Sequence, residues 1–414
     1  MKKIKFYLTS LISFTAFVLP NTNYCQTFTK LTTGNATSFD GLSFCSDNNG
    51  YVSGGTTILK TVDGGANWTL ATSPCVDTWD VFAVRENSID YIYAVGDNGK
   101  VSKSSDGGNT WIAQSSKFTN SAYSFIFGVW CKDKDNCYLN GGDENSAGIV
   151  KTTDGGTTWS KKITSGVFFE ECYFADANTG YAVGANDFGG DGVIAKSTDG
   201  GNSWNVVKII TGEWGNSLYC TDANTCYVAA TGGAILKTSD GGSSWQIQNS
   251  GTTNSLFDVR FINSTTGYIV GTAGTLLKTT NGGTNWMDIY TGTENLASIS
   301  VPPSGNSIYV AGSGGTILKA VLVTGIDETS FENRMNIYPN PTSGNITIEL
   351  NENTSNVATI SIANILGEVL CTKKEILSHS EEINLKSIGL SSGIYFIKAE
   401  TKDSQLTQKV ILTD

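Results

Sequence analysis

The stretch Lys237-Thr238-Ser239-Asp240-Gly241-Gly242-Ser243-Ser244-Trp245 decides the fold, because similar stretches return at regular intervals along the chain. From one copy to the next, the acidic or amide residue advances by 43, 48, 45, 41 and 41 residues. A period of this length is typical of propeller blades and other stacked repeats. The copies, called boxes below, contain Asp63, Asp106, Asp154, Asp199, Asp240 and Asn281, followed five residues later by Trp68, Trp111, Trp159, Trp204, Trp245 and Trp286.

The residues of each box predict a tight turn. The Asp or Asn side chain can accept hydrogen bonds from the backbone amides of the turn, and the Gly-Gly pair can adopt positive φ angles. The tryptophan packs the turn against the outer strand. We therefore expect the box residues to be structural rather than ligand-binding.

A second signature, Tyr-x-x-Gly followed by a lysine, precedes every box, with Ala230 in place of the glycine in the fifth repeat, and a seventh copy from Tyr309 to Lys319 has no box after it. One repeat reads as four short strands separated by turns rich in Gly, Asn and Asp. In the fifth repeat these strands are expected near residues 217–220, 226–229, 234–238 and 245–248. Each repeat is thus predicted to be a four-stranded blade.

The N-terminus is expected to supply the strand that the seventh repeat lacks. After Lys319 the chain continues without a turn, whereas residues 28–32 resemble the outer strand of the other repeats. The sequence therefore predicts an all-β, seven-bladed β-propeller over residues 26–325, closed by the N-terminal strand. Such closure leaves few open sheet edges.

Residues 1–25 read as a secretory signal peptide, with lysines before an apolar run over residues 7–19. Cys25 lacks a convincing lipobox, so cleavage near Gln26 is favoured over lipoprotein anchoring. The run is short for a membrane span, and no other apolar run approaches its length. We expect an exported mature protein without a transmembrane segment.

Disulfides persist outside the cytoplasm, so the cysteines of an exported protein can be paired with one another. Cys131 and Cys137 in the third repeat, and Cys220 and Cys226 in the fifth, flank the same turn and are predicted to pair across it. A metal site is disfavoured, because the spacing is not Cys-x-x-Cys and the propeller has no histidine. The pairing of the remaining propeller cysteines cannot be read from the sequence, and these are Cys45, Cys75 and Cys172.

Charge and composition exclude several functions. The net charge of −11 makes nucleic acid a poor partner. The only histidine, His379, lies outside the repeats, so serine–histidine catalysis is not expected in the propeller. Arg85 and Arg260 are the only arginines of the blades. No cofactor is predicted, although calcium stays open.

The loops that enter the inner strands and those between the second and third strands share the face opposite the boxes, which is the candidate binding face. Aromatic residues recur in the entering segments, with inter-blade core as the alternative role for them. The predicted ligand-binding residues are Phe39, Trp79, Tyr123, Phe169, Trp214 and Phe257.

Acidic residues near the same face support two further hypotheses. Two carboxylates could form an acid/base pair for glycoside hydrolysis if they lie roughly 5 to 9.5 Å apart, and the candidates are Asp80, Glu170, Glu213 and Asp258. The longer loops of the third and fourth repeats could bind calcium, with merely solvated loops as the alternative, and their acids are Asp143, Asp187 and Asp191.

The box resembles the Asp-box of sialidases, some glycoside hydrolases and sortilin-type propellers, where it lies far from the functional face. The whole blade pattern over residues 40–320 resembles the photosystem II assembly/stability factor family of seven-bladed propellers. That resemblance implies an assembly platform without catalytic residues. The arginine-rich contact surface of the family has no counterpart here, and neither has the arginine triad of a sialidase.

After a polar linker over residues 326–334, alternating strands over residues 335–414 predict a small immunoglobulin-like β-sandwich. The motifs Tyr-Pro-Asn-Pro-x-x-Gly from Tyr338 and Leu-x-x-Gly-Ile-Tyr-Phe-Ile-Lys from Leu390 resemble the type A C-terminal sorting domain of type IX secretion cargo. Glu368 stands where that family usually has arginine. The resemblance implies an owner in the Bacteroidota, the type IX secretion machinery as partner, and either release or attachment at the outer-membrane surface.

Together these observations predict a secreted or surface-attached propeller that binds a polysaccharide or an envelope protein through its box-distal face. The alternative is a glycoside hydrolase that uses paired carboxylates on that face. A third hypothesis is a structural spacer or adhesin, and it predicts neither a pocket nor an exposed aromatic cluster on that face.

Deletion of residues 335–414 is expected to leave the protein in the periplasm, because the sorting signal would be lost. Cell fractionation with an antibody to the propeller checks this. Normal surface delivery of the truncated chain would contradict it.

Overall fold

The computed structural model describes residues 28–71, 77–118, 123–143, 146–164, 166–186, 190–322, 335–350, 356–364, 369–377, 380–400 and 405–413. The predicted signal peptide and linker lie outside these residues. The chain divides into two compact units, one of Gln26–Thr324 and one that contains Gly325–Asp414. Each unit is described by itself.

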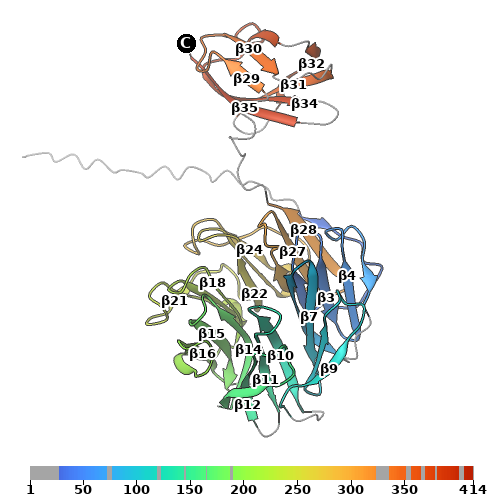
Figure 1. The fold of residues 1–414 in the computed structure, drawn as a ribbon. Coiled ribbons are helices and arrows are strands. Elements are labelled where there is room, and N and C mark those ends of the chain that lie inside the picture. Colours follow the sequence, from blue (N-terminus) through green and yellow to red (C-terminus); the bar gives the residue numbers. More distant parts are fainter. Residues whose placement is uncertain are drawn as a thin grey trace, which may run out of the picture. The chain divides into compact units, whose positions relative to one another are not determined.

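The first unit consists of seven antiparallel four-stranded sheets, so the predicted seven blades are confirmed (Figure 1). In six blades the strands follow chain order from the inner to the outer edge. The first three blades contain β2 (Gly41–Phe44), β3 (Gly50–Gly54), β4 (Thr57–Thr61) and β5 (Thr69–Leu70); β6 (Thr78–Glu86), β7 (Ile89–Gly96), β8 (Lys100–Ser104) and β9 (Ile112–Ser115); and β10 (Phe125–Cys131), β11 (Cys137–Asp143), β12 (Ser146–Thr152) and β13 (Ser160–Thr164).

The next three blades follow the same order, with a single 3-10 turn, η1 (Thr231–Gly233) or η2 (Thr272–Gly274), between the second and third strands of two of them. Their strands are β14 (Val167–Phe174), β15 (Gly180–Asn186), β16 (Gly192–Ser197) and β17 (Asn205–Ile210); β18 (Gly215–Cys220), β19 (Cys226–Ala230), β20 (Ile235–Thr238) and β21 (Gln246–Gln248); and β22 (Leu256–Phe261), β23 (Gly267–Gly271), β24 (Leu276–Thr279) and β25 (Met287–Asp288).

The seventh blade takes its outer strand from the N-terminus. It contains β26 (Leu296–Ser300), β27 (Ser307–Gly312) and β28 (Thr316–Val321), and β1 (Thr29–Lys30) pairs antiparallel with β28. In Figure 1 the orange β28 accordingly lies beside the blue start of the unit. The pairing of the first strand with the last strand of the propeller is the one expected from the sequence.

The boxes form the tight turns that their residues predict. In the first box, Asp63 Oδ1 accepts the N–H of Asn67 at 2.9 Å, and the Thr61 hydroxyl donates to the same carboxylate at 2.8 Å. Gly64 and Gly65 have φ angles of 67° and 85°. These hydrogen bonds stabilise the charged carboxylate and lower the pKa of Asp63 to about 2.

A lysine of each of six blades binds the box of the next blade, a contact called the clamp below. In five of these blades, those of Lys103, Lys151, Lys196, Lys237 and Lys319, the ammonium group also lies over the ring of the signature tyrosine, 5.1–5.4 Å from its centroid. The clamp thus explains the Tyr–Lys signature. Lys319 of the seventh blade, which has no box, clamps the first. The Nζ-to-carbonyl pairs are Lys60–Gly107 (3.2 Å), Lys103–Gly155 (2.9 Å), Lys151–Gly200 (2.6 Å), Lys196–Gly241 (2.6 Å), Lys237–Gly282 (2.7 Å) and Lys319–Gly64 (2.9 Å).

Side chains of the inner strands join adjacent blades a second time. A carboxylate or hydroxyl of one inner strand accepts a backbone N–H of the next inner strand, which an edge strand would otherwise leave unpaired. In the third blade the position of the accepting residue is occupied by Gly128, which has no side chain to accept the hydrogen bond. A Cβ there would lie 2.3 Å from the Glu170 carbonyl of the fourth blade. The other six contacts are Ser43–Ala83, Asp80–Val129, Glu171–Leu218, Ser217–Val259, Asp258–Ile299 and Ser300–Phe44, at 2.7–3.2 Å.

Both predicted disulfides are present, Cys131–Cys137 and Cys220–Cys226. Each joins the facing ends of the first two strands of its blade. Cys45 and Cys172 are buried free thiols. Cys75 lies outside the described residues.

The second unit has two small sheets, ordered β29-β30-β33 and β32-β31-β34-β35, which share one apolar core that includes Ile348, Ile360 and Ile397. The Asn340 side chain of the Tyr-Pro-Asn-Pro motif donates to the Lys409 carbonyl at 2.7 Å and accepts the Ile411 N–H at 2.9 Å, so the motif holds the last strand. The strands are β29 (Met335–Tyr338), β30 (Asn345–Leu350), β31 (Asn356–Asn364), β32 (Val369–Leu377), β33 (Ser380–Asn384), β34 (Gly393–Glu400) and β35 (Gln405–Leu412).

Replacing one clamp lysine should weaken the propeller measurably. Lys237→Met keeps most of the side-chain volume but removes the charged donor to the Gly282 carbonyl, which still accepts a hydrogen bond from the Tyr227 hydroxyl at 2.9 Å. We expect a loss of about 1–2 kcal/mol in the free energy of unfolding, measured with urea. Lys132→Met, at an exposed turn lysine, is the matched control and should change little. Equal stability of the two variants would contradict the clamp.

The box carboxylates should make stability depend on acid pH. The pKa of Asp240 is lowered to about 2 from an ordinary value of 3.8 by hydrogen bonds from Ser244 and Thr238. A lowered pKa adds stability above pH 4 that is lost as the pH falls toward 2. Asp240→Asn, which copies Asn281 of the sixth box, should therefore cost stability at pH 5 but not at pH 2, as measured by urea unfolding. A pH-independent difference would argue against this account.

Candidate functional site

A β-bulge lies near the start of the inner strand in six blades, and it places one extra residue there. In a β-bulge, two consecutive residues of one strand face a single residue of the paired strand. The side chain of the extra residue therefore points to the same side of the sheet as the side chain of the next residue. The successors Asp80, Glu171 and Ser298 line the space enclosed by the inner strands. The extra residues, with Asp40 at the corresponding place before β2, form what we call the mouth ring: Asp40, Trp79, Phe127, Glu170, Asn216, Phe257 and Ala297.

The mouth ring lies at the end of the inner strands that is remote from the boxes. The turn after each inner strand contacts the box of its own blade, since Gly64 donates its N–H to the Asn48 carbonyl at 2.9 Å and Gly241 donates to Asn224 at 3.0 Å. The inner strands therefore end beside the boxes and begin at the opposite face. This is the face that the sequence analysis selected.

Burial separates the mouth ring from the residues next to it. Trp79 is 43% exposed and Asp40 is exposed, whereas Phe127, Glu170 and Phe257 are half-buried. Phe39 and Phe169 each precede a ring residue and are fully buried in the core. The prediction that Phe39 and Phe169 face a ligand is therefore corrected: they have the alternative role, inter-blade core.

A row of aromatic rings starts at the mouth ring and crosses three blades. Trp79 meets Phe127 edge to face at 5.8 Å, and Phe127 meets Phe168 edge to face at 6.4 Å. The Trp79 Nε1–H donates to Asp97 Oδ1 at 2.7 Å, which fixes the indole. The sequence analysis missed Phe127, because no residue pattern marks the bulge that exposes it.

The two other predicted aromatics lie just before inner strands. Tyr123 is 68% exposed and stands two residues before β10. Trp214 is half-buried directly before β18, and its backbone N–H donates to the Thr231 hydroxyl at 2.9 Å. Neither is a member of the mouth ring.

The mouth ring contains two carboxylates, Asp40 and Glu170. Neither side chain forms a hydrogen bond or an ion pair with any residue that the structure describes. Burial raises the pKa of Glu170 to about 7. The ring thus combines aromatic side chains with carboxylates that have no partner of their own in the described part of the chain.

The other acidic candidates are engaged within the fold. Asp80 accepts the N–H groups of Val81 and Val129 at 2.8 and 3.0 Å, and burial raises its pKa to about 7. Asp258 accepts the Ile299 N–H at 2.7 Å and pairs with Arg260. Glu213 accepts a hydrogen bond from the Thr231 hydroxyl. These groups join elements of the propeller.

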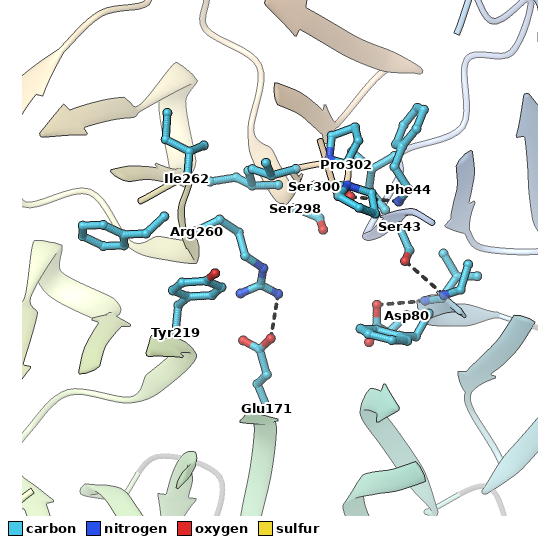
Figure 2. Close-up of a pocket in the computed structure, with 18 of the residues that line it drawn as sticks. Ser43, Phe44, Asp80, Glu171, Tyr219, Arg260, Ile262, Ser298, Ser300 and Pro302 are labelled. Atoms are coloured by element: carbon cyan, nitrogen blue, oxygen red, sulfur yellow. Dashed lines mark hydrogen bonds and ion pairs between the residues drawn. The ribbon is translucent and has the colours of Figure 1, made fainter. Parts of the chain in front are cut away.

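A cavity of about 360 Å³ lies among the inner strands (Figure 2). Arg260 spans part of it, with Nη2 2.7 Å from Glu171 Oε1 and its guanidinium 6.0 Å from the centre of the Tyr219 ring. Pro302 and Pro303 of the turn after β26 also line the cavity, so it extends toward the box side. This cavity could not be predicted from the sequence, because its lining comes from several blades.

The structure offers no described set of calcium ligands. Asp143 is buried at the end of β11, and Asp191 accepts the Gly212 N–H at 2.8 Å. Asp187 lies outside the described residues. Among the residues that the structure places, no three His, Cys, Asp or Glu side chains gather as a metal site would require. The same residues include no helix with the length and apolarity needed to cross a membrane.

Comparison with protein families identifies both parts of the chain. The family described as photosynthesis system II assembly factor YCF48 matches residues 119–253 and 243–330, just over half of the 414 residues. The chain belongs to the YCF48 family. Residues 336–413 match the secretion system C-terminal sorting domain, which implies secretion across the outer membrane by the type IX system.

Solved structures show the same fold. YCF48 from Cyanidioschyzon merolae is 16% identical over 71% of this chain and 98% of its own, with a TM-score of 0.58. YCF48 bound to D1 peptide is 18% identical over 71% and 97%, with a TM-score of 0.57. An inactive virginiamycin B lyase from Staphylococcus aureus is 13% identical over 72% and 99%, with a TM-score of 0.57. No curated protein sequence matches the chain.

Proposed function

We propose that the chain is an exported binding protein whose propeller holds its ligand, a polysaccharide or an envelope protein, at the mouth ring and performs no catalysis. The observation that carries this proposal is the row of aromatic side chains at the box-distal face, with Trp79 fixed by Asp97 and 43% exposed. Large rigid aromatics contribute most of the binding energy in many interfaces.

The family supports a binding role. One YCF48 structure is described as bound to D1 peptide, so that relative holds a peptide on a propeller of this fold. By analogy, a protein segment is a suitable ligand for the propeller of this chain. The fold alone does not decide the matter, since a propeller of similar shape is a lyase.

The acidic side chains favour binding over glycoside hydrolysis. A hydrolase needs two carboxylates free to exchange protons with substrate. Asp80 and Asp258 are held by backbone N–H groups of neighbouring blades, and Glu213 by a hydroxyl. Glu170 and Asp40 are the ring carboxylates without such contacts among the described residues, and they belong to different blades, the fourth and the first.

Truncating Trp79 should weaken binding of the ligand. The purified full chain would be immobilised and exposed separately to the polysaccharide and to the detergent-extracted envelope proteins of the producing bacterium. Retention would be recorded by surface plasmon resonance, and release of shorter sugars by mass spectrometry. We expect at least about a tenfold loss of affinity for Trp79→Ala, or about 1.4 kcal/mol, and no sugar release.

Ile247→Ala is the matched control, because Ile247 is a 77% exposed apolar residue on the outer strand β21. It should bind like the unmodified chain. Equal binding by the two variants would show that the ligand does not bind at the mouth ring. Sugar release that Glu170→Gln abolishes would make the protein a hydrolase.

A further inference from the structure

We infer that the mouth ring receives a positively charged side chain, lysine or arginine, from an extended segment of an envelope protein. This inference rests on the proposed function and names the chemistry of the ligand. It follows from the charge of the ring, from its aromatic faces and from its two carboxylates.

The ring and the layer beneath it contain more acidic than basic side chains. The seven ring positions contain two carboxylates and no cation. One residue further along the inner strands stand Asp80, Glu171 and Asp258. Arg260, two residues beyond Asp258, is already paired, with Glu171 at 2.7 Å and Asp258 at 2.9 Å. A cationic group entering at the ring meets complementary charge, whereas an anionic group is repelled.

The aromatic side chains suit the same ligand. The faces of Trp and Phe rings attract ammonium and guanidinium groups. Trp79 is fixed by its hydrogen bond to Asp97, so a further carboxylate stands beside the exposed indole. The propeller uses the same chemistry in its clamps, where Lys103 lies 5.1 Å from the centre of the Tyr93 ring.

The carboxylates of Asp40 and Glu170 make a neutral ligand less suitable. Within the described residues neither side chain has a hydrogen-bond or ionic partner, and Glu170 is half-buried. A half-buried carboxylate without a partner is costly to keep charged, as the raised pKa of Glu170 indicates. A lysine or arginine side chain would supply the missing partner, and a neutral sugar would not supply the charge.

The test uses the full chain and four synthetic peptides that share a Gly-Ser backbone and differ at one central residue: Lys, Arg, Nε-acetyl-Lys or Glu. Affinity is measured by isothermal titration calorimetry in low and moderate salt. We expect the Lys and Arg peptides to bind at least about tenfold more tightly than the acetyl-Lys peptide, and the Glu peptide not to bind. Added salt should weaken binding, because screening reduces the attraction.

Two variants locate the site. Glu170→Gln should reduce the affinity for the Lys peptide about tenfold, without a change in thermal unfolding. Asp47→Asn is the matched control, because Asp47 is an exposed carboxylate in the turn beside the first box, on the opposite face. It should bind like the unmodified chain. Equal affinity for the Lys and acetyl-Lys peptides, or equal loss in the two variants, would overturn the inference.

The inference and the proposed function can fail separately. Envelope material bound in a Trp79-dependent manner, without preference for the Lys peptide, would leave the binding function intact and refute the cationic ligand. Retention of polysaccharide alone would also refute it. If Trp79→Ala binds all envelope material normally, the mouth ring is not the site and both proposals fail.

Discussion

The clamp is the contact on which the rest of the propeller depends. One ammonium group lies over the tyrosine ring of its own blade and binds the box carbonyl of the next, as Lys151 does with Gly200 at 2.6 Å. No blade has a large core of its own, so its stability comes from its neighbours. The clamp fixes the blades at the box side, and the side chains of the inner strands fix them at the centre.

Periodic and local features were predictable from the sequence. The repeat length, the Tyr–Lys signature and the unpaired seventh repeat together implied seven blades and the pairing of β1 with β28, because each rests on short-range chemistry repeated many times. The disulfides also followed from their place in the repeat. The clamp itself was not foreseen, because its two partners belong to different repeats.

The box-distal face contains the mouth ring, but only part of this ring was predicted from the sequence. A bulge inserts one residue, and a shift of one residue moves a side chain to the other side of a strand. Phe169, which precedes the bulge of its strand, is therefore core, and Phe39 is core at the corresponding place before β2, where no bulge occurs. Their neighbours Asp40 and Glu170 belong to the mouth ring. Bulges are features of the pairing between strands, and no residue pattern in this sequence marks them.

The seventh blade has a further consequence for biogenesis. Its outer strand, Thr29–Lys30, pairs with Thr316–Val321. These two neighbouring strands of one sheet are the first and the last strands of the propeller to be synthesised. Six blades can form their hairpins as the chain emerges, but the last sheet must wait until β28 is available. Until that moment the earliest strand stays without its partner. A protein that is secreted across the outer membrane thereby delays the completion of its last sheet until the propeller chain is complete.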